Sequence, residues 1–159
     1  MRHRRRSVAG IFAAVTLNVT LGVTLAVTLG GATAPQGTDV SVTVTDMRST
    51  KGQVLACLTM RPDAFPNCEK DPAARKLTVP AASGLNLHFG AVPQGRYAVS
   101  LIHDENGNGK LDTRLIIPRE GYGFSRDAPV RMGPPKFAQA AFDVGPEPVH
   151  LAIRMRYLL

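Results

Sequence analysis

Tryptophan is absent from this chain of 159 residues, which also has only two cysteines, six phenylalanines and three tyrosines. The missing tryptophan argues against an antibody-type sandwich, whose core packs a buried tryptophan on the disulfide. It also argues against a sugar-binding face, because sugars usually stack on aromatic rings. The motifs His-Glu-x-x-His and Gly-x-Ser-x-Gly and the glycine-rich phosphate loop are missing as well. We therefore expect a protein that is not an enzyme.

Charged residues are missing from a long apolar run near the N-terminus. The basic residues 2–6 precede an uncharged segment at 7–31, and Ala-Thr-Ala follows at 32–34. A basic start, an apolar stretch and an Ala-x-Ala site are typical of a secretory signal peptide. We predict a signal peptide at 1–34, a short linker at 35–38 and one domain at 39–159, in the periplasm or outside the cell. The alternative is an uncleaved membrane anchor, because the run is long enough to span a bilayer.

The formal net charge of +7 is mostly explained by this segment. Four of the nineteen Lys and Arg residues lie in the predicted signal, which has none of the twelve acidic residues, so fifteen basic residues remain against twelve acidic ones. No basic stripe of the kind that binds nucleic acid is left. We expect partners in the cell envelope, a protein or a glycan, and contact with a membrane only through the signal before cleavage.

The cysteines, Cys57 and Cys68, are separated by ten residues. An isolated pair in an exported protein usually forms a disulfide. The gap fits neither Cys-x-x-Cys redox chemistry nor a zinc knuckle. We predict a structural disulfide that closes a short loop.

Alternation of apolar and polar residues indicates strands along most of the remaining chain. The clearest are 40–45, where Val alternates with Ser and Thr, and 149–157. Shorter strands are predicted at 53–60, 76–79, 85–89, 97–102 and 114–117. The Pro- and Gly-rich segment 118–135 predicts a long irregular loop, and 137–144 fits either a helical turn or a strand. The pattern predicts an all-β fold, an antiparallel β-sandwich of about seven strands that is immunoglobulin-like or transthyretin-like.

The most distinctive segment is a loop of Asp, Asn and Gly at 104–112. Asp104, Asn106 and Asn108 occupy positions 1, 3 and 5 of the calcium-loop pattern, Lys110 offers its carbonyl at position 7, and Asp112 stands at position 9. Calcium requires six to eight oxygen ligands, which alternate residues of a tight coil supply.

The calcium pattern is incomplete, because position 12 is Leu115 instead of a bidentate Glu. Glu105 or Glu120 would supply the missing carboxylate only if the fold brought it close. Asp, Asn and Gly are also the usual residues of a metal-free turn, in which side chains bond the nearby backbone. Calcium binding and a metal-free turn both remain open interpretations.

The segment after this loop suggests a ligand surface. Tyr122 and Phe124 lie on a glycine-rich stretch, and Arg119 and Arg126 flank them. Exposed aromatic rings would offer a stacking surface, and the arginines would attract an anionic ligand. The alternative is that the two rings fold back and cap the sandwich.

Several motifs together resemble a known family. They are His-Asp-Glu-Asn-Gly-Asn-Gly-Lys-Leu-Asp-Thr at 103–113, Pro-Arg-Glu-Gly-Tyr-Gly-Phe-Ser at 118–125, Gly-Pro-Pro-Lys-Phe at 133–137, Ala-Phe at 141–142 and Arg-Tyr at 156–157. Over nearly all of residues 39–158 the chain resembles the bacterial family called domain of unknown function 2141, which implies an exported protein with no established activity. Residues 92–104 also resemble a strand of carboxypeptidase-regulatory and transthyretin-like sandwiches, a likeness of fold that carries no function.

These observations lead to three functional hypotheses. The first is an exported, non-enzymatic binding or structural module of the cell envelope. The second is a calcium-stabilised module that binds a glycan or a peptide, although the lack of tryptophan weakens the glycan version. The third is a hydrolase of unknown type.

Overall fold

The computed structural model describes residues 37–159. The predicted signal peptide, residues 1–34, and the first half of the predicted linker lie outside the described residues. None of the helices within 37–159 has the length and apolar character needed to span a membrane.

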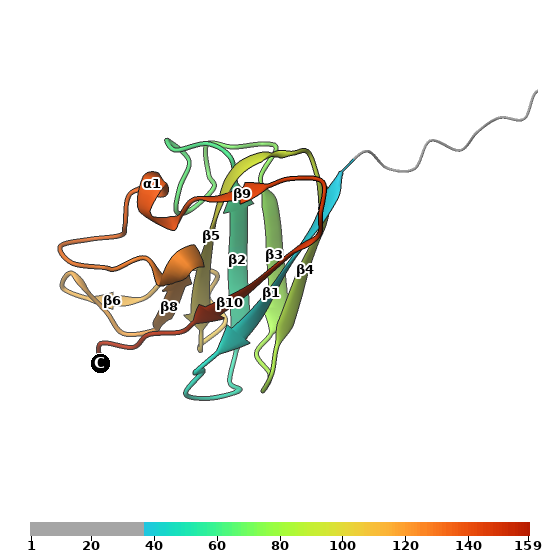
Figure 1. Cartoon of the computed structure of the whole chain (residues 1–159). Coiled ribbons are helices and arrows are strands. Elements are labelled where there is room, and N and C mark those ends of the chain that lie inside the picture. Colours follow the sequence, from blue (N-terminus) through green and yellow to red (C-terminus); the bar gives the residue numbers. More distant parts are fainter. Residues whose placement is uncertain (1–36) are drawn as a thin grey trace, which may run out of the picture. The chain divides into compact units, whose positions relative to one another are not determined.

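The fold has two main β-sheets (Figure 1). In the three-stranded sheet, β1 (Thr38–Thr45) lies between β4 (Asn86–Val92), with which it is antiparallel, and β10 (Val149–Arg154), with which it is parallel. The register pairs Val40 with Val149, so segments from the two ends of the described chain are neighbours.

The second sheet has the strand order β3-β2-β5-β8 and is antiparallel throughout. Its strands are β3 (Arg75–Pro80), β2 (Gln53–Thr59), β5 (Gly95–Asp104) and β8 (Gly121–Phe124), and β9 (Phe142–Val144) pairs with the start of β5. Smaller elements complete the fold: the hairpin of β6 (Thr113–Arg114) and β7 (Ile117–Pro118), the 3-10 turn η1 (Ser125–Asp127) and the helical turn α1 (Phe137–Ala140).

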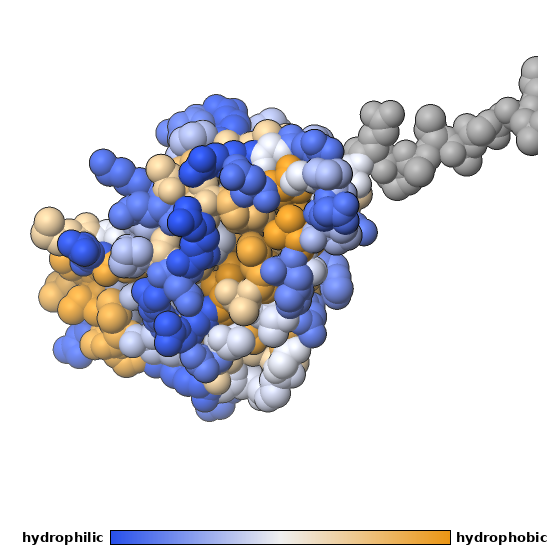
Figure 2. All heavy atoms as spheres, in the orientation of Figure 1, coloured by the Kyte–Doolittle hydropathy of each residue, from blue (hydrophilic) through white to orange (hydrophobic). Residues whose placement is uncertain are grey.

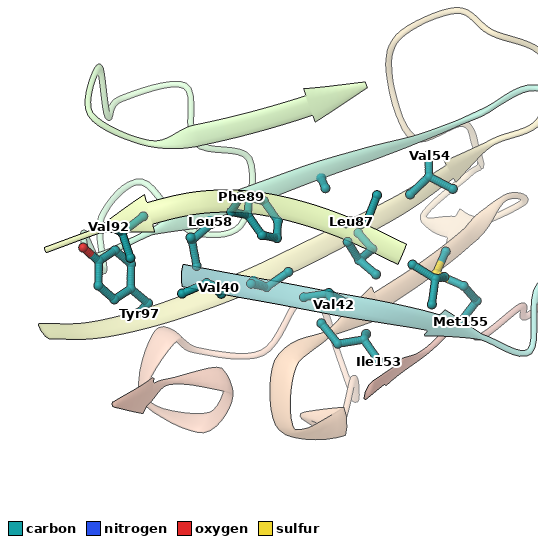
Figure 3. Close-up of a cluster of buried hydrophobic side chains, with 14 of the residues drawn as sticks. Val40, Val42, Val54, Leu58, Leu87, Phe89, Val92, Tyr97, Ile153 and Met155 are labelled. Carbon is teal, nitrogen blue, oxygen red and sulfur yellow. The ribbon is translucent and has the colours of Figure 1, made fainter. Parts of the chain in front are cut away.

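The apolar faces of the two main sheets enclose the core, as the alternating sequence predicts (Figure 3). Val40, Val42 and Val44 of β1 are all buried, whereas the Ser and Thr residues between them point outward. They pack with Val54 and Leu58 of the opposite sheet. The prediction of an all-β, antiparallel fold is confirmed.

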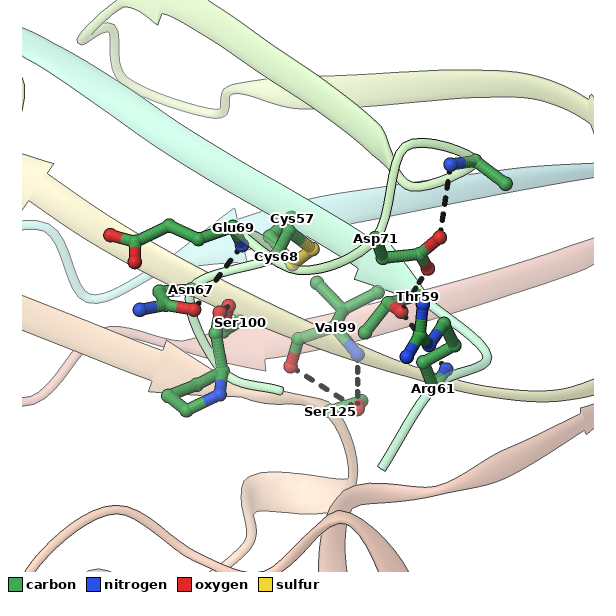
Figure 4. Close-up of a disulfide and its surroundings, with 12 residues drawn as sticks. Cys57, Thr59, Arg61, Asn67, Cys68, Glu69, Asp71, Val99, Ser100 and Ser125 are labelled. Carbon is green, nitrogen blue, oxygen red and sulfur yellow. Dashed lines mark hydrogen bonds between the residues drawn. A yellow bond between two sulfur atoms is a disulfide. The ribbon is translucent and has the colours of Figure 1, made fainter. Parts of the chain in front are cut away.

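The disulfide between Cys57 and Cys68 is present and joins β2 to the loop that follows it (Figure 4). Both cysteines are buried, and their Cα atoms are 6.0 Å apart. The hydroxyl of Ser100 on β5 donates to the carbonyl of Pro66 in the same loop. The proline-rich loop is therefore fixed against the sheet by one covalent bond and by hydrogen bonds.

The prediction of one long irregular loop at 118–135 is wrong, because this segment contains β8 and η1 and begins with the last residue of β7. The glycines at 121 and 123 suggest a loop from the sequence. In the structure they lie in the strand β8, where they allow another segment of the chain to pack closely. A Cβ atom on Gly121 would lie 2.5 Å from the Tyr157 ring, and one on Gly123 would lie 3.0 Å from the carbonyl oxygen of Arg154. The ambiguous segment 137–144 contains both predicted structures, the helical turn α1 and then the strand β9.

Candidate functional site

The loop 104–112, called here the Asp/Asn loop, begins where β5 ends and is organised around Asp104. The Asp104 side chain is fully buried. One carboxylate oxygen accepts the backbone N–H groups of Gly107 at 2.8 Å and Asn108 at 3.1 Å. The other accepts the N–H of Gly109 at 2.7 Å and the side-chain amide of Gln53 at 2.8 Å. Four donors therefore use the lone pairs of this carboxylate, which holds the loop in its coil.

Three other predicted calcium ligands meet on the outside of the loop. The side-chain amides of Asn106 and Asn108 donate to the two oxygens of the Asp112 carboxylate, at 2.6 Å and 2.9 Å. The backbone N–H of Lys110 donates to the side-chain oxygen of Asn108 at 3.1 Å. The structure thus brings Asn106, Asn108 and Asp112 together, whereas Asp104 bonds to the backbone between them.

Glu120, one of the two candidates for the missing carboxylate, bonds to the backbone at both ends of the Asp/Asn loop. It is buried, and its two oxygens accept the backbone N–H groups of Glu105 at 3.0 Å and Asp112 at 2.9 Å. These two N–H groups lie at opposite ends of the Asp/Asn loop, so the Glu120 carboxylate fastens the two ends to each other. Within residues 37–159, no group of three or more His, Cys, Asp or Glu side chains is placed to hold a metal ion.

The hydrogen bonds keep two carboxylates of this loop in the charged form. Burial raises the pKa of Asp104, but the bonds from Gln53 and the backbone N–H groups outweigh it and lower the pKa below its ordinary value. The amides of Asn108 and Asn106 lower the pKa of Asp112. Both negative charges are therefore stabilised by neutral donors of the protein itself.

A second cluster, which sequence reasoning missed, supports the loop from the side. The Arg48 guanidinium bonds the Glu105 carboxylate, with its Nε at 3.2 Å from both oxygens, and lies 4.5 Å from the centre of the Tyr157 ring. The Tyr157 hydroxyl lies 2.7 Å from Nδ1 of the buried His103. The Arg-Tyr pair at 156–157 was a family motif and so offered a signal for Tyr157, but nothing marked Arg48.

The predicted aromatic surface is wrong. Tyr122 is 5% exposed and Phe124 is 8% exposed, because β8 is paired with β5 and its aromatic side chains pack into a small second core. This core also contains Phe65 and Phe137, whose rings lie 5.8 Å and 6.1 Å from their nearest aromatic partners. The alternative, that the rings fold back on the sandwich, describes the structure.

The two arginines of that predicted surface differ from each other. Both are exposed. Arg126 donates to the carbonyl of Ala141 at 3.1 Å, so it ties η1 to the end of α1. Arg119 follows the β6–β7 hairpin, and only its backbone is engaged, with its carbonyl accepting a bond from Arg48 at 3.0 Å. Of the two arginines, Arg119 is exposed and its guanidinium has no hydrogen bond or ion pair among residues 37–159.

Comparison with known proteins agrees with the family motifs in the sequence. A family model described as an uncharacterized protein conserved in bacteria, domain of unknown function 2141, matches residues 42–152. Neither a curated protein nor a solved structure matches the chain significantly. The match spans both main sheets, the Asp/Asn loop and Glu120. This chain is therefore a member of the bacterial family called domain of unknown function 2141.

Proposed function

We propose that this protein is an exported module of the cell envelope that works by binding, and that its binding end is built on the Asp/Asn loop. The observation that carries the proposal is that the polar groups expected to do chemistry are already satisfied by the protein. His103 is fully buried, and its ring nitrogens lie 2.7 Å from the Tyr157 hydroxyl and 2.9 Å from the Lys51 carbonyl. Such a histidine has no free nitrogen for proton transfer to a substrate.

The other candidate groups for catalysis are His150 on β10 and Ser125 in η1. His150 lies on the outer face of β10, where its ring nitrogens are 2.9 Å and 3.0 Å from the hydroxyls of Ser41 and Thr43. Ser125 is buried and donates to the Ala140 carbonyl at 2.6 Å. General-base catalysis needs a nucleophile and a base within hydrogen-bond reach of a substrate. Ser41 and Thr43 lie within that reach of His150, but among residues 37–159 both ring nitrogens are taken up by these hydroxyls and no carboxylate bonds the ring to orient it. This arrangement favours binding over hydrolysis.

Export is supported by the N-terminal pattern and by the disulfide, since structural disulfides persist in oxidising compartments. The test is to express the full chain in a bacterium and to separate cytoplasm, periplasm, membranes and medium. We expect to find the protein outside the cytoplasm. Its intact mass should match residues 35–159, with no sign of cleavage at a second position. Recovery of the full-length chain in the cytoplasm, with two reactive thiols, would overturn the proposal.

A second candidate function is stabilisation by calcium, which the meeting of Asn106, Asn108 and Asp112 favours. Rotation of the two amides would turn their oxygens toward Asp112 and create a group of oxygens around one point. Asp104 fits a cation less well, because four N–H donors already bind its oxygens. If calcium binds, its site is therefore weak, in the range of about 0.1 to 1 mM that extracellular modules use.

Thermal melting distinguishes an Asp/Asn loop that binds calcium from one that is stable without metal. The wild-type chain and an Asp112→Asn variant are melted in 5 mM calcium (about five to fifty times the expected Kd) and in chelator. A calcium-dependent rise in Tm that Asp112→Asn abolishes supports the site. An equal Tm in calcium and chelator rejects it and leaves the metal-free loop.

A further inference from the structure

The β6–β7 hairpin ends in an apolar tip. Leu115 is 91% exposed and Ile116 is 92% exposed, and the next residue, Ile117, is 42% exposed. Hydrophobic atoms gather at the left end of Figure 2, where Figure 1 places β6. Single exposed apolar residues are ordinary, but three in a row at a projecting tip mark a surface that binds something apolar.

The turn itself does not explain the apolar residues. Leu115 has a φ of +59°, in the left-handed region, where the Cβ of an ordinary residue is crowded. Two-residue hairpin turns with such a φ favour Gly, Asn or Asp. Leucine is therefore unfavourable at this turn position, and because its side chain is exposed, no burial of apolar surface compensates for it. A strained residue at an exposed tip indicates a role outside the fold.

The base of the hairpin is held by backbone pairing and hydrogen bonds. Thr113 pairs with Pro118 and Arg114 with Ile117, and the N–H of Arg119 donates to the carbonyl of Asp112 at 2.9 Å. The Glu120 carboxylate then joins Asp112 to the end of β5. The tip therefore needs little further ordering when it binds, which lowers the entropic cost of association.

Basic residues flank the hairpin in the sequence. Lys110, Arg114 and Arg119 are exposed, and none of them forms an ion pair with another described residue. The nearby carboxylates are occupied, since Asp112 is bonded by amides and Glu120 is buried. Segment 110–119 has three basic side chains and one acidic side chain. An apolar tip flanked by exposed basic residues is complementary to a surface that is apolar inside and anionic at its edge.

We propose that the β6–β7 hairpin docks this protein on a lipid bilayer that contains anionic headgroups. Leu115 and Ile116 enter the boundary between headgroups and acyl chains, and Lys110, Arg114 and Arg119 contact lipid phosphates. A lipid surface fits better than a protein partner because the tip is convex and wholly aliphatic, whereas protein hot spots are enriched in Trp and Tyr and poor in Leu. The inference rests on the proposed function only in that export brings the tip to an envelope membrane.

The lack of tryptophan makes a direct test possible, because one introduced indole reports on one position. Ile116→Trp is made in the full chain, and the exported form is purified. The matched control is Gln94→Trp, in the exposed turn at the opposite end of β5. Vesicles of phosphatidylcholine with and without phosphatidylglycerol are then added. We expect the Ile116→Trp emission to move to shorter wavelength with the anionic vesicles, and to be quenched by brominated lipid, while Gln94→Trp does not respond.

Affinity measured by vesicle sedimentation adds a second readout. Leu115→Ser together with Ile116→Ser is expected to lower binding at least about 100-fold, and Arg114→Ser or Arg119→Ser about fivefold each. The circular dichroism of these variants is expected to match the wild type, because the changed side chains are exposed. An indole at 116 that ignores both vesicles overturns the lipid proposal. A blue shift that needs no vesicles but rises with protein concentration overturns it in favour of a second copy of the chain. Either result leaves the test of export by fractionation untouched.

Discussion

At the scale of single residues, two buried carboxylates organise this end of the fold, and they differ in what they hold. Asp104 holds the coil of its own loop, and Glu120 holds the two ends of that loop together. The sequence marks Asp104 clearly, because Asp followed by Asn and Gly at these spacings is a known turn pattern. The role of Glu120 was not predictable, since its partners are backbone groups that only the tertiary fold brings near it.

We predict that Asp104→Ala lowers the free energy of unfolding by about 3 kcal/mol, because it leaves several N–H groups without their charged acceptor. Asp112→Ala is the matched control, since its partners are side-chain amides that water reaches, and we expect it to destabilise the protein much less than Asp104→Ala. Urea denaturation in the presence of chelator measures both. Equal effects from the two variants would contradict the central role of Asp104.

At the scale of elements, the regular strands follow from the pattern, and the irregular ones do not. The alternation of Val with Ser and Thr in β1 identifies both the strand and its buried face. In β8, glycine alternates with aromatic residues for a reason that local sequence cannot reveal. The glycine side of the strand is covered by residues 153–157, and the aromatic side fills the second core. The ligand surface was assigned wrongly for the same reason, because aromatic residues among glycines resemble an exposed loop.

Gly121→Ala tests this explanation of β8. The added methyl group would meet the Tyr157 ring and force it away from His103 and Arg48. We expect a loss of about 1 to 3 kcal/mol in the free energy of unfolding. Gly145→Ala is the control, because a Cβ there meets nothing within 4 Å, and its expected effect is within about 0.5 kcal/mol. A wild-type stability for Gly121→Ala would mean that Tyr157 is not held against β8.

The loop closed by the disulfide between Cys57 and Cys68 also contributes to stability. Reduction releases a cross-link between residues that are 11 positions apart, which the chain-entropy model values at about 3 kcal/mol. We expect reductant to lower the Tm of the wild type and to leave the Tm of a Cys57→Ala, Cys68→Ala double variant unchanged. The double variant should melt near the reduced wild type. A reductant effect of equal size in both proteins would exclude this bond as the cause.

At the scale of the whole molecule, the individual carboxylates matter more than the net charge, because their ionisation contributes to folding stability. Hydrogen bonds lower the pKa of Asp104, Asp112 and Asp71, and the Arg48 guanidinium lowers that of Glu105. A carboxyl group whose pKa is lower in the folded state stabilises the protein above its unfolded pKa of about 4. That contribution is lost as the pH falls through the folded pKa.

We therefore expect the urea midpoint to be level near neutral pH and to decline below about pH 4. In Asp104→Asn, stability at neutral pH should be lower and the acid decline shallower, because one of the titrating groups is gone. Denaturation curves from pH 3 to 7 measure both. An acid decline as steep in the variant as in the wild type would show that Asp104 does not contribute to it.

The pairing of β1 with β10 has a consequence for the order in which the protein folds. The middle strand of the three-stranded sheet comes near the start of the domain, and its parallel neighbour comes from the far end of the chain. A chain that becomes available from its N-terminus cannot complete that sheet until its last strand is present, whereas the β2–β3 hairpin can pair early from local contacts. One edge of β1 therefore waits for the final segment of the chain, and closure of the three-stranded sheet is a late event in folding.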